Sequence, residues 1–102
     1  MIKIFDETSL NEDLNKKKIL YLYFYSPGCG PCKITSPLVQ EFGNSIEDIV
    51  YIVNSREAKE LQNQLEVFAY PSLIIIKNNK VIKGGVGQDE VTKIIKDGTS
   101  NK

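Results

Sequence analysis

The segment Ile19 to Tyr25, which reads ILYLYFY, is the feature that most constrains the fold of this 102-residue chain. Every position is apolar or aromatic, so a strand formed here needs other parts of the protein to cover both of its faces. Such a strand belongs at the centre of a sheet that has helices on both sides. We therefore predict that residues 19–25 form the central strand of an α/β domain.

The rest of the chain alternates between helical and strand patterns. Helices are expected where apolar residues recur every three or four positions, and strands where short aliphatic runs lie between turn residues. The expected helices cover residues 9–17, 32–42, 55–65 and a segment from Asp89 onward, and the expected strands cover 49–53, 72–76 and 81–85. A first strand is expected to be reduced to residues 2–5 or lost. This order predicts one domain over residues 1–102, with a mixed sheet between helices and a flexible tail at 98–102.

The second helix has a pattern specific enough to test. Ile34, Leu38 and Phe42 recur at helical spacing and are predicted to form its buried stripe. Pro37 removes one backbone hydrogen bond inside the helix, so a bend is expected there. The helix is predicted to end at Gly43 and Asn44.

Caps and turns are predicted at four further places. Ser9, with Glu12 three residues later, matches a capping box at the start of the first helix. Ser55 is expected to cap the third helix and Asp89 the fourth. The pair Asn78-Asn79 predicts a two-residue hairpin turn, because asparagine tolerates positive φ better than most residues.

Composition argues against several classes of function. The 13 basic and 13 acidic residues balance, so neither a nucleic acid nor a membrane surface is an expected partner. The chain has no histidine, which removes the commonest general base and the commonest metal ligand. No signal peptide or membrane-spanning pattern is visible, so we expect a soluble cytoplasmic protein, and nothing requires more than a monomer.

The motif Cys29-Gly30-Pro31-Cys32-Lys33 directly follows the predicted central strand. A thiolate at Cys29 would lie near the unpaired N–H groups of the next helix, which can lower a thiol pKa from about 8.5 toward neutrality. Gly30 permits a tight bend, and Pro31 suits a helix start because it has no N–H to leave unpaired. Lys33 adds a positive charge that favours a nearby thiolate.

Three functions are open for two cysteines at this spacing. A structural disulfide over so short a loop restricts the unfolded chain only slightly. A closed zinc site would need two more ligands, and without histidine or further cysteines these would have to come from a second chain. A close cysteine pair in a reducing compartment is more often redox-active or metal-binding than structural. Thiol–disulfide exchange is therefore the favoured interpretation.

Taken together, these features resemble the thioredoxin family. The motif at residues 29–33 follows an aromatic strand, Pro37 lies five residues after the second cysteine, Tyr70-Pro71-Ser72 precedes an aliphatic strand, and Gly87 follows a hairpin later. The agreement extends over about residues 19–95. The resemblance implies a thioredoxin-like three-layer α/β sandwich, with a central mixed sheet of four to five strands flanked by helices.

The resemblance also implies roles for individual residues. Cys29 would attack a substrate disulfide, and Cys32 would resolve the mixed disulfide. Tyr70-Pro71 would be a cis peptide bond that offers the Tyr70 backbone to the substrate. The groove that docks the substrate would consist of Gly28, Tyr70, Pro71, Val86 and Gly87. No bound cofactor is implied, because the Cys29–Cys32 disulfide carries the two electrons, and the electron donor would be a flavoprotein reductase or glutathione.

Two positions depart from the family pattern. The residue before the first cysteine is usually tryptophan and here is Gly28, which removes an apolar contact and loosens the loop. The position six residues before the first cysteine is usually a buried aspartate and here is Tyr23, and the lysine that often accompanies it would fall near Ile52. A phenol is a poor base at neutral pH, but losing a nearby negative charge favours the thiolate and makes a disulfide more oxidising. The Tyr23 hydroxyl is expected to bond to a sulfur or an ordered water.

The sequence thus predicts a thiol–disulfide oxidoreductase that reduces protein disulfides. Within the enzymes, the alternatives are a disulfide oxidase or isomerase, or a glutaredoxin-like enzyme that uses glutathione. Outside them, the alternative is a non-catalytic thioredoxin-like module that binds a partner in its groove.

Overall fold

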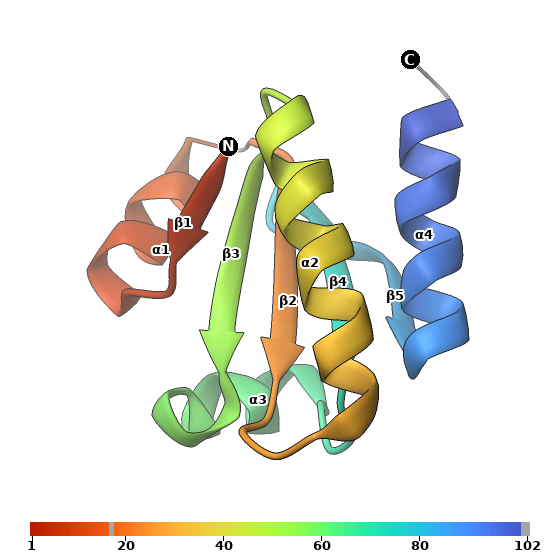
Figure 1. The fold of residues 1–102 in the computed structure, drawn as a ribbon. Coiled ribbons are helices and arrows are strands. Elements are labelled where there is room, and N and C mark those ends of the chain that lie inside the picture. Colours follow the sequence, from red (N-terminus) through yellow and green to blue (C-terminus); the bar gives the residue numbers. More distant parts are fainter. Residues whose placement is uncertain (17, 101–102) are drawn as a thin grey trace.

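The computed structural model describes residues 1–16 and 18–100 of the chain. Its helices and strands follow one another as shown in Figure 1. They are β1 (Ile2–Ile4), α1 (Glu7–Asn15), β2 (Leu20–Tyr25), α2 (Gly30–Ser45), β3 (Ile49–Asn54), the short 3-10 helix η1 (Ser55–Glu57), α3 (Lys59–Leu65), β4 (Ser72–Lys77), β5 (Lys80–Val86) and α4 (Gln88–Ser100).

The sheet has five strands in the order β1-β3-β2-β4-β5. Strand β2 lies at its centre, parallel to β3 and antiparallel to β4, so that Tyr23 is opposite Ile52 on one side and Leu73 on the other. Strand β1 pairs in parallel with β3 through Ile2 and Val50. The mixed sheet, its central strand and the shortened first strand are therefore confirmed.

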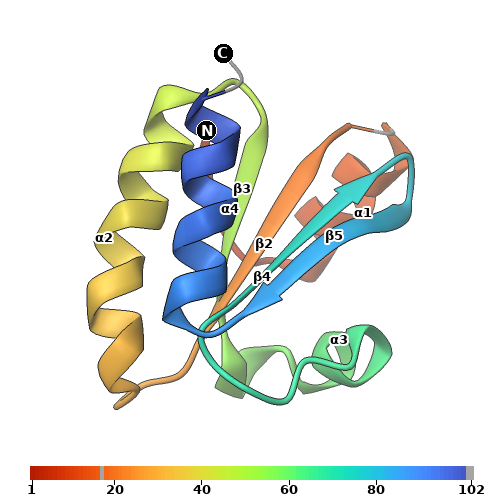
Figure 2. The same ribbon diagram turned by 90° about the vertical axis from the view of Figure 1, so that its right-hand side faces the viewer.

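Helices cover both faces of this sheet, as Figures 1 and 2 show, with α2 and α4 side by side on one face and α1 on the other. Alternate residues of β2 point to opposite faces, as strand geometry requires. Leu22 and Phe24 belong to the core shared with α1 and α3. Tyr23 belongs to the core shared with α2 and α4, whose inner face contributes Val91. The three-layer arrangement predicted from the sequence is confirmed.

The start of α1 differs from its prediction. The helix begins at Glu7, and its N-cap is Asp6, whose carboxylate accepts a hydrogen bond from the Ser9 N–H at 3.0 Å. Ser9 is therefore not the cap, and its hydroxyl lies 2.8 Å from that of Tyr51. Lys17, the last residue of the predicted helix, lies outside the described residues.

The predicted cap at Ser55 is also wrong. Ser55 opens η1, and the cap there is Asn54, whose side-chain oxygen accepts a hydrogen bond from the Arg56 N–H at 3.0 Å. Helix α3 then begins at Lys59 without a side-chain cap. Capping side chains compete with one another over a few residues, so the pattern alone located the helix but not its first turn.

Helix α4 begins at Gln88, so Asp89 lies in its first turn instead of capping it. A carboxylate in that position is still stabilised by the positive end of the helix dipole. The side chain of Glu90 reaches back and accepts a hydrogen bond from the Val86 N–H at 3.0 Å. The helix continues past Gly98 to Ser100, and the rest of the predicted tail, residues 101–102, lies outside the described part of the chain.

The buried stripe of α2 is not the predicted one. Ile34 is 54% exposed and Leu38 is 38% exposed. The residues that α2 buries are instead Cys32, Thr35, Val39, Phe42 and Gly43. Both stripes share Phe42 and both obey helical spacing, but the buried one is the less apolar because it includes Thr35, whose hydroxyl is hydrogen-bonded.

Helix α2 also continues beyond its predicted end at Gly43 and reaches Ser45. Gly43 lies where the helix passes over the sheet, and a Cβ atom added there would meet the side chain of Ile2 and lie 3.3 Å from the Cβ of Val50. Glycine is therefore present for close packing and does not terminate the helix. The helix also runs through Pro37, and the predicted bend there stays a prediction.

The hairpin between β4 and β5 is confirmed. Asn78 and Asn79 have φ values of 52° and 64°, and the flanking residues Lys77 and Lys80 are paired. Two consecutive positive φ angles are the requirement of a type I′ turn, which matches the twist of the strands that it joins.

Candidate active site

A tight turn joins β2 to the cysteine motif. The Cys29 N–H donates a hydrogen bond to the Ser26 carbonyl at 3.1 Å, and Gly28 within the turn has a φ of 85°. Proline at the second position, here Pro27, and glycine at the third are typical of a type II turn, because the third position needs positive φ. Gly28 was expected to loosen this loop, and the structure instead places it where a hydrogen-bonded turn requires glycine.

This turn delivers Cys29 to the start of α2, where it forms a disulfide with Cys32. Cys29 is the N-cap of the helix, and its Sγ accepts a hydrogen bond from the Cys32 N–H at 3.2 Å. Pro31 occupies the first turn, as predicted. Cys29 is half-buried, whereas Cys32 is only 4% exposed. The two sulfur atoms therefore have different surroundings, one at the positive end of the helix and partly open to solvent, the other enclosed.

The surface next to the disulfide is apolar with one positive charge. Gly28, Gly30 and Pro31 are exposed, and Lys33 is exposed in the first turn of α2. Ile34, which the sequence analysis placed in the core, is 54% exposed beside them. An exposed aliphatic side chain at the start of the helix offers contact area to an extended partner.

Tyr70-Pro71 is a cis peptide bond, as the resemblance implied. Strand pairing places Ser72 opposite Phe24, so this bond lies at the same edge of the sheet as the cysteine motif (Figure 1). The Pro71 carbonyl accepts a hydrogen bond from the Gly87 N–H at 2.8 Å. The hydroxyl of Tyr70 donates to the side chain of Gln62, which turns the tyrosine ring toward α3.

Hydrogen bonding and strand pairing thus bring three of the five predicted docking residues together. Pro71 is bonded to Gly87, and Val86 pairs with the residue after Pro71. Val86 is 51% exposed, and Gly87 has a φ of 90°. Gly28 lies in the turn that precedes the motif.

Tyr23 is fully buried, and its hydroxyl lies 2.6 Å from the Thr35 Oγ1 and 2.9 Å from the Ser36 Oγ. Both of these partners are hydroxyl groups of α2, and neither is the expected sulfur. Sequence reasoning missed Thr35 and Ser36. The available signal was the position of Thr35, three residues after Cys32 and thus on the same face of the helix.

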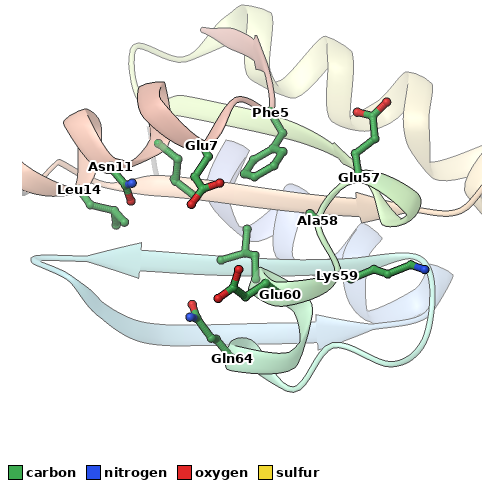
Figure 3. A pocket seen from close by; sticks show the side chains of 11 residues that line it. Phe5, Glu7, Asn11, Leu14, Glu57, Ala58, Lys59, Glu60 and Gln64 are labelled. Atoms are coloured by element: carbon green, nitrogen blue, oxygen red, sulfur yellow. The ribbon is translucent and has the colours of Figure 1, made fainter.

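A groove of about 300 Å³ lies elsewhere, between α1 and α3 on the face of the sheet opposite to α2 and α4 (Figure 3). Phe5 and Ala58 contribute apolar surface to it, and Glu7 and Glu60 come from the two helices that border it. None of the predicted site residues lines this groove. The site defined by the two cysteines is therefore on the surface and not in this hollow.

Comparison with known proteins agrees with this geometry. The family model for thioredoxin matches residues 1–99. The chain is 26% identical over 100 residues to thioredoxin from Mycoplasmoides gallisepticum, covering 94% of this chain and 100% of that protein. It is 35% identical over 78 residues to thioredoxin-1 from Caenorhabditis elegans, covering 74% of this chain and 68% of that protein. The crystal structure of Schistosoma mansoni thioredoxin superposes with a TM-score of 0.81 at 27% identity, covering 94% of each chain. This chain therefore belongs to the thioredoxin family of thiol–disulfide oxidoreductases.

Proposed function

We propose that this chain reduces protein disulfides, with Cys29 as the attacking cysteine and Cys32 as the resolving cysteine. The observation that carries this assignment is the difference in burial: Cys29 is half-buried at the helix end, and Cys32 is 4% exposed. An attacking thiolate has to reach the sulfur of another protein, whereas a resolving thiolate has only to reach its neighbour.

The surroundings of Cys29 suit a thiolate in the reduced protein. The Cys32 N–H already points at its sulfur, and this donor would be retained when the disulfide opens. A negative charge at a helix N-terminus is stabilised by about 0.3 to 2 kcal/mol. Lys33 in the first turn adds a second favourable charge, so Cys29 is the thiol that the fold activates.

The reaction then proceeds in two exchanges. The Cys29 thiolate attacks one sulfur of the substrate disulfide, forms a mixed disulfide and releases the other substrate sulfur as a thiolate. The Cys32 thiol loses its proton to solvent, and its thiolate attacks the Cys29 sulfur. This step forms the Cys29–Cys32 disulfide and releases the second substrate thiolate. Two electrons have passed to the substrate, whose two thiolates take up protons.

The substrate segment would dock along the edge formed by Gly28, Tyr70, Pro71, Val86 and Gly87. Support comes from the exposure of Val86 and from the hydrogen bond that holds Gly87 against Pro71. An extended segment would pair with the Tyr70 backbone, while Val86 and Ile34 contact its apolar side chains.

The partners follow from this chemistry. No bound cofactor is required, because the disulfide itself holds the two electrons, and a flavoprotein reductase or glutathione would restore the dithiol. We place the protein in the cytoplasm as a monomer, where a reducing environment sustains this cycle. Across residues 1–16 and 18–100, no helix is long and apolar enough to cross a membrane. The zero net charge supports the absence of nucleic-acid and membrane partners.

The reduction of insulin by dithiothreitol tests this proposal. We expect the wild-type chain to accelerate insulin reduction and Cys29→Ser to return it to the uncatalysed rate. Cys32→Ser should retain the first exchange, because only the resolving step is lost, and should accumulate a mixed disulfide that mass spectrometry detects at Cys29.

The matched pair of serine variants also separates an enzyme from a binding module. A binding module would retain its partner in the Cys29→Ser variant. Insulin reduction by Cys29→Ser at the wild-type rate, or a mixed disulfide formed through Cys32 in the Cys29→Ser protein, would overturn the assigned roles.

A further inference from the structure

Tyr23 projects from the centre of β2 toward α2, which lies beside this strand in Figure 1. Both Tyr23 and Thr35 have no exposed surface, and their hydroxyl oxygens are 2.6 Å apart. Ser36, which is half-buried, lies 2.9 Å from the same tyrosine oxygen. A buried hydroxyl without a partner is costly, so these contacts favour one position of the helix relative to the strand.

The hydrogen atoms of this cluster have a preferred direction. The Thr35 Oγ1 lies 3.3 Å from the Pro31 carbonyl oxygen, and a carbonyl can only accept. Thr35 has one hydroxyl hydrogen, and when it donates this hydrogen to the Pro31 carbonyl, Tyr23 donates to Thr35. Ser36 then donates to Tyr23. The bonds run from Ser36 through Tyr23 and Thr35 to Pro31, and bonds aligned in this way strengthen one another.

This chain of hydroxyl groups ends in the turn that holds both sulfur atoms. Pro31 lies between the two cysteines, and the Cys32 N–H that donates to the Cys29 Sγ at 3.2 Å belongs to the same turn. A hydrogen bond weakens steeply when its angle or distance is disturbed. The turn from Ser26 to Cys29 ties Cys29 to the end of β2, so a small shift of α2 relative to β2 would disturb the hydrogen bond from the Cys32 N–H to the Cys29 sulfur.

We propose that Tyr23 is a positioning residue for disulfide exchange, which acts through Thr35 to hold the first turn of α2 so that the Cys32 N–H faces the Cys29 sulfur. The inference rests on the proposed roles of the two cysteines and names the group that sets their geometry. Tyr23 acts through geometry and not as a proton acceptor, because a phenol is a poor base at neutral pH and both of its partners are hydroxyl groups.

The test measures how fast iodoacetamide alkylates Cys29 in the reduced protein as a function of pH, with the labelled residue identified by mass spectrometry. We expect Tyr23→Phe, which keeps the ring and removes the hydroxyl, to alkylate three- to tenfold more slowly near pH 7. Its pH profile should move upward, because a less stabilised thiolate forms at higher pH. Thr35→Val should act in the same direction, and Thr35→Ser, which keeps the hydroxyl, should restore the wild-type profile.

Tyr51→Phe is the matched control. Tyr51 is also a fully buried tyrosine on an inner strand, but its hydroxyl bonds to Asp13 and Ser9 on the opposite face of the sheet. We expect this variant to lose stability and to keep the wild-type pH profile. A loss of stability alone therefore does not reproduce the effect expected of Tyr23→Phe.

The proposal is overturned if Tyr23→Phe alkylates with the wild-type profile, however much stability it loses, or if Tyr51→Phe shifts the profile equally. If Tyr23→Phe fails to fold, the comparison of Thr35→Val with Thr35→Ser tests the proposal instead. Equal pH profiles of Cys29 alkylation in these two variants would contradict it. Alkylation needs no protein substrate. A wild-type chain that fails to reduce insulin would therefore contradict the proposed function, but the alkylation measurement would still test the positioning role of Tyr23.

Discussion

At the scale of single residues, the most buried charge among the described residues lies away from the cysteines. Asp13 is 2% exposed and accepts hydrogen bonds from the Lys3 Nζ at 2.9 Å and from the Tyr51 hydroxyl. Burial acts to raise the pKa of Asp13, but the bonds from Tyr51 and Lys3 and the charge of Lys3 outweigh it, so this pKa lies below its usual 3.8. Burial, together with the bond to Asp13, raises the pKa of Tyr51 to about 12.

The variant Asp13→Asn tests this network. A carboxyl group whose pKa is lowered by folding stabilises the native state above its unfolded pKa, and this contribution is lost as the pH falls through the folded pKa. We expect Asp13→Asn to lower the free energy of unfolding at pH 7 by about 1.5 to 3 kcal/mol, the range for a hydrogen bond to a charged group. In urea unfolding from pH 7 to pH 2, the difference from the wild type should narrow below pH 3.8. A difference that stays constant over this range would show that the charge of Asp13 contributes nothing.

At the scale of elements, the packing of α2 against β1 depends on a residue that seemed to end the helix. Gly43 is buried, and an added Cβ atom would lie 2.9 Å from the Ile2 Cγ1 and would meet the end of the same side chain. The sequence predicted α2 correctly as a helix, but it could not distinguish a terminating glycine from a packing glycine. That distinction depends on Ile2, which lies forty-one positions away in the sequence and becomes a neighbour only in the folded sheet.

The variant Gly43→Ala is expected to destabilise the protein, although alanine favours helices over glycine by about 1 kcal/mol. Overpacking a core commonly costs about 1 to 3 kcal/mol, which exceeds that gain. Ile2→Val removes the terminal methyl group that the new Cβ meets. We therefore expect the double variant to lose less stability than the sum of the two single variants, as a double-mutant cycle by urea unfolding would measure. Additive losses would mean that Gly43 and Ile2 are not coupled.

At the scale of the whole molecule, the architecture could be predicted because local patterns agree with the global fold. The apolar strand at residues 19–25, the Asn78-Asn79 turn and the cysteine motif each specify one local structure, and together they leave few topologies. The hydroxyl cluster around Tyr23 and the ion pair of Asp13 could not be predicted. Each joins a strand to a distant helix through polar side chains, and their contact depends on how the helix is rotated and which face it buries.

The balance between reduction and oxidation is also a property of the whole molecule. Stabilising the Cys29 thiolate at the start of α2 favours the dithiol form, and Tyr23 offers neutral hydroxyl partners beneath that turn. Compared with a buried carboxylate at the position of Tyr23, both effects raise the midpoint potential of the disulfide. Each 30 mV corresponds to about 1.4 kcal/mol in the free-energy difference between the dithiol and disulfide forms. We expect a value between about −270 mV, which is usual for thioredoxin, and about −200 mV.

Equilibration with dithiothreitol and glutathione buffers at neutral pH would measure this potential, and urea unfolding of the oxidised and reduced forms provides an independent check. The two measurements are linked, because a fold that favours the dithiol loses correspondingly less stability on reduction. A value within the expected interval fits a disulfide reductase with a moderately oxidising disulfide. A value near that of a strong oxidant, about −120 mV, would mean that the neutral surroundings of the cysteines shift the protein to forming or isomerising disulfides, and the reductase assignment would then be wrong.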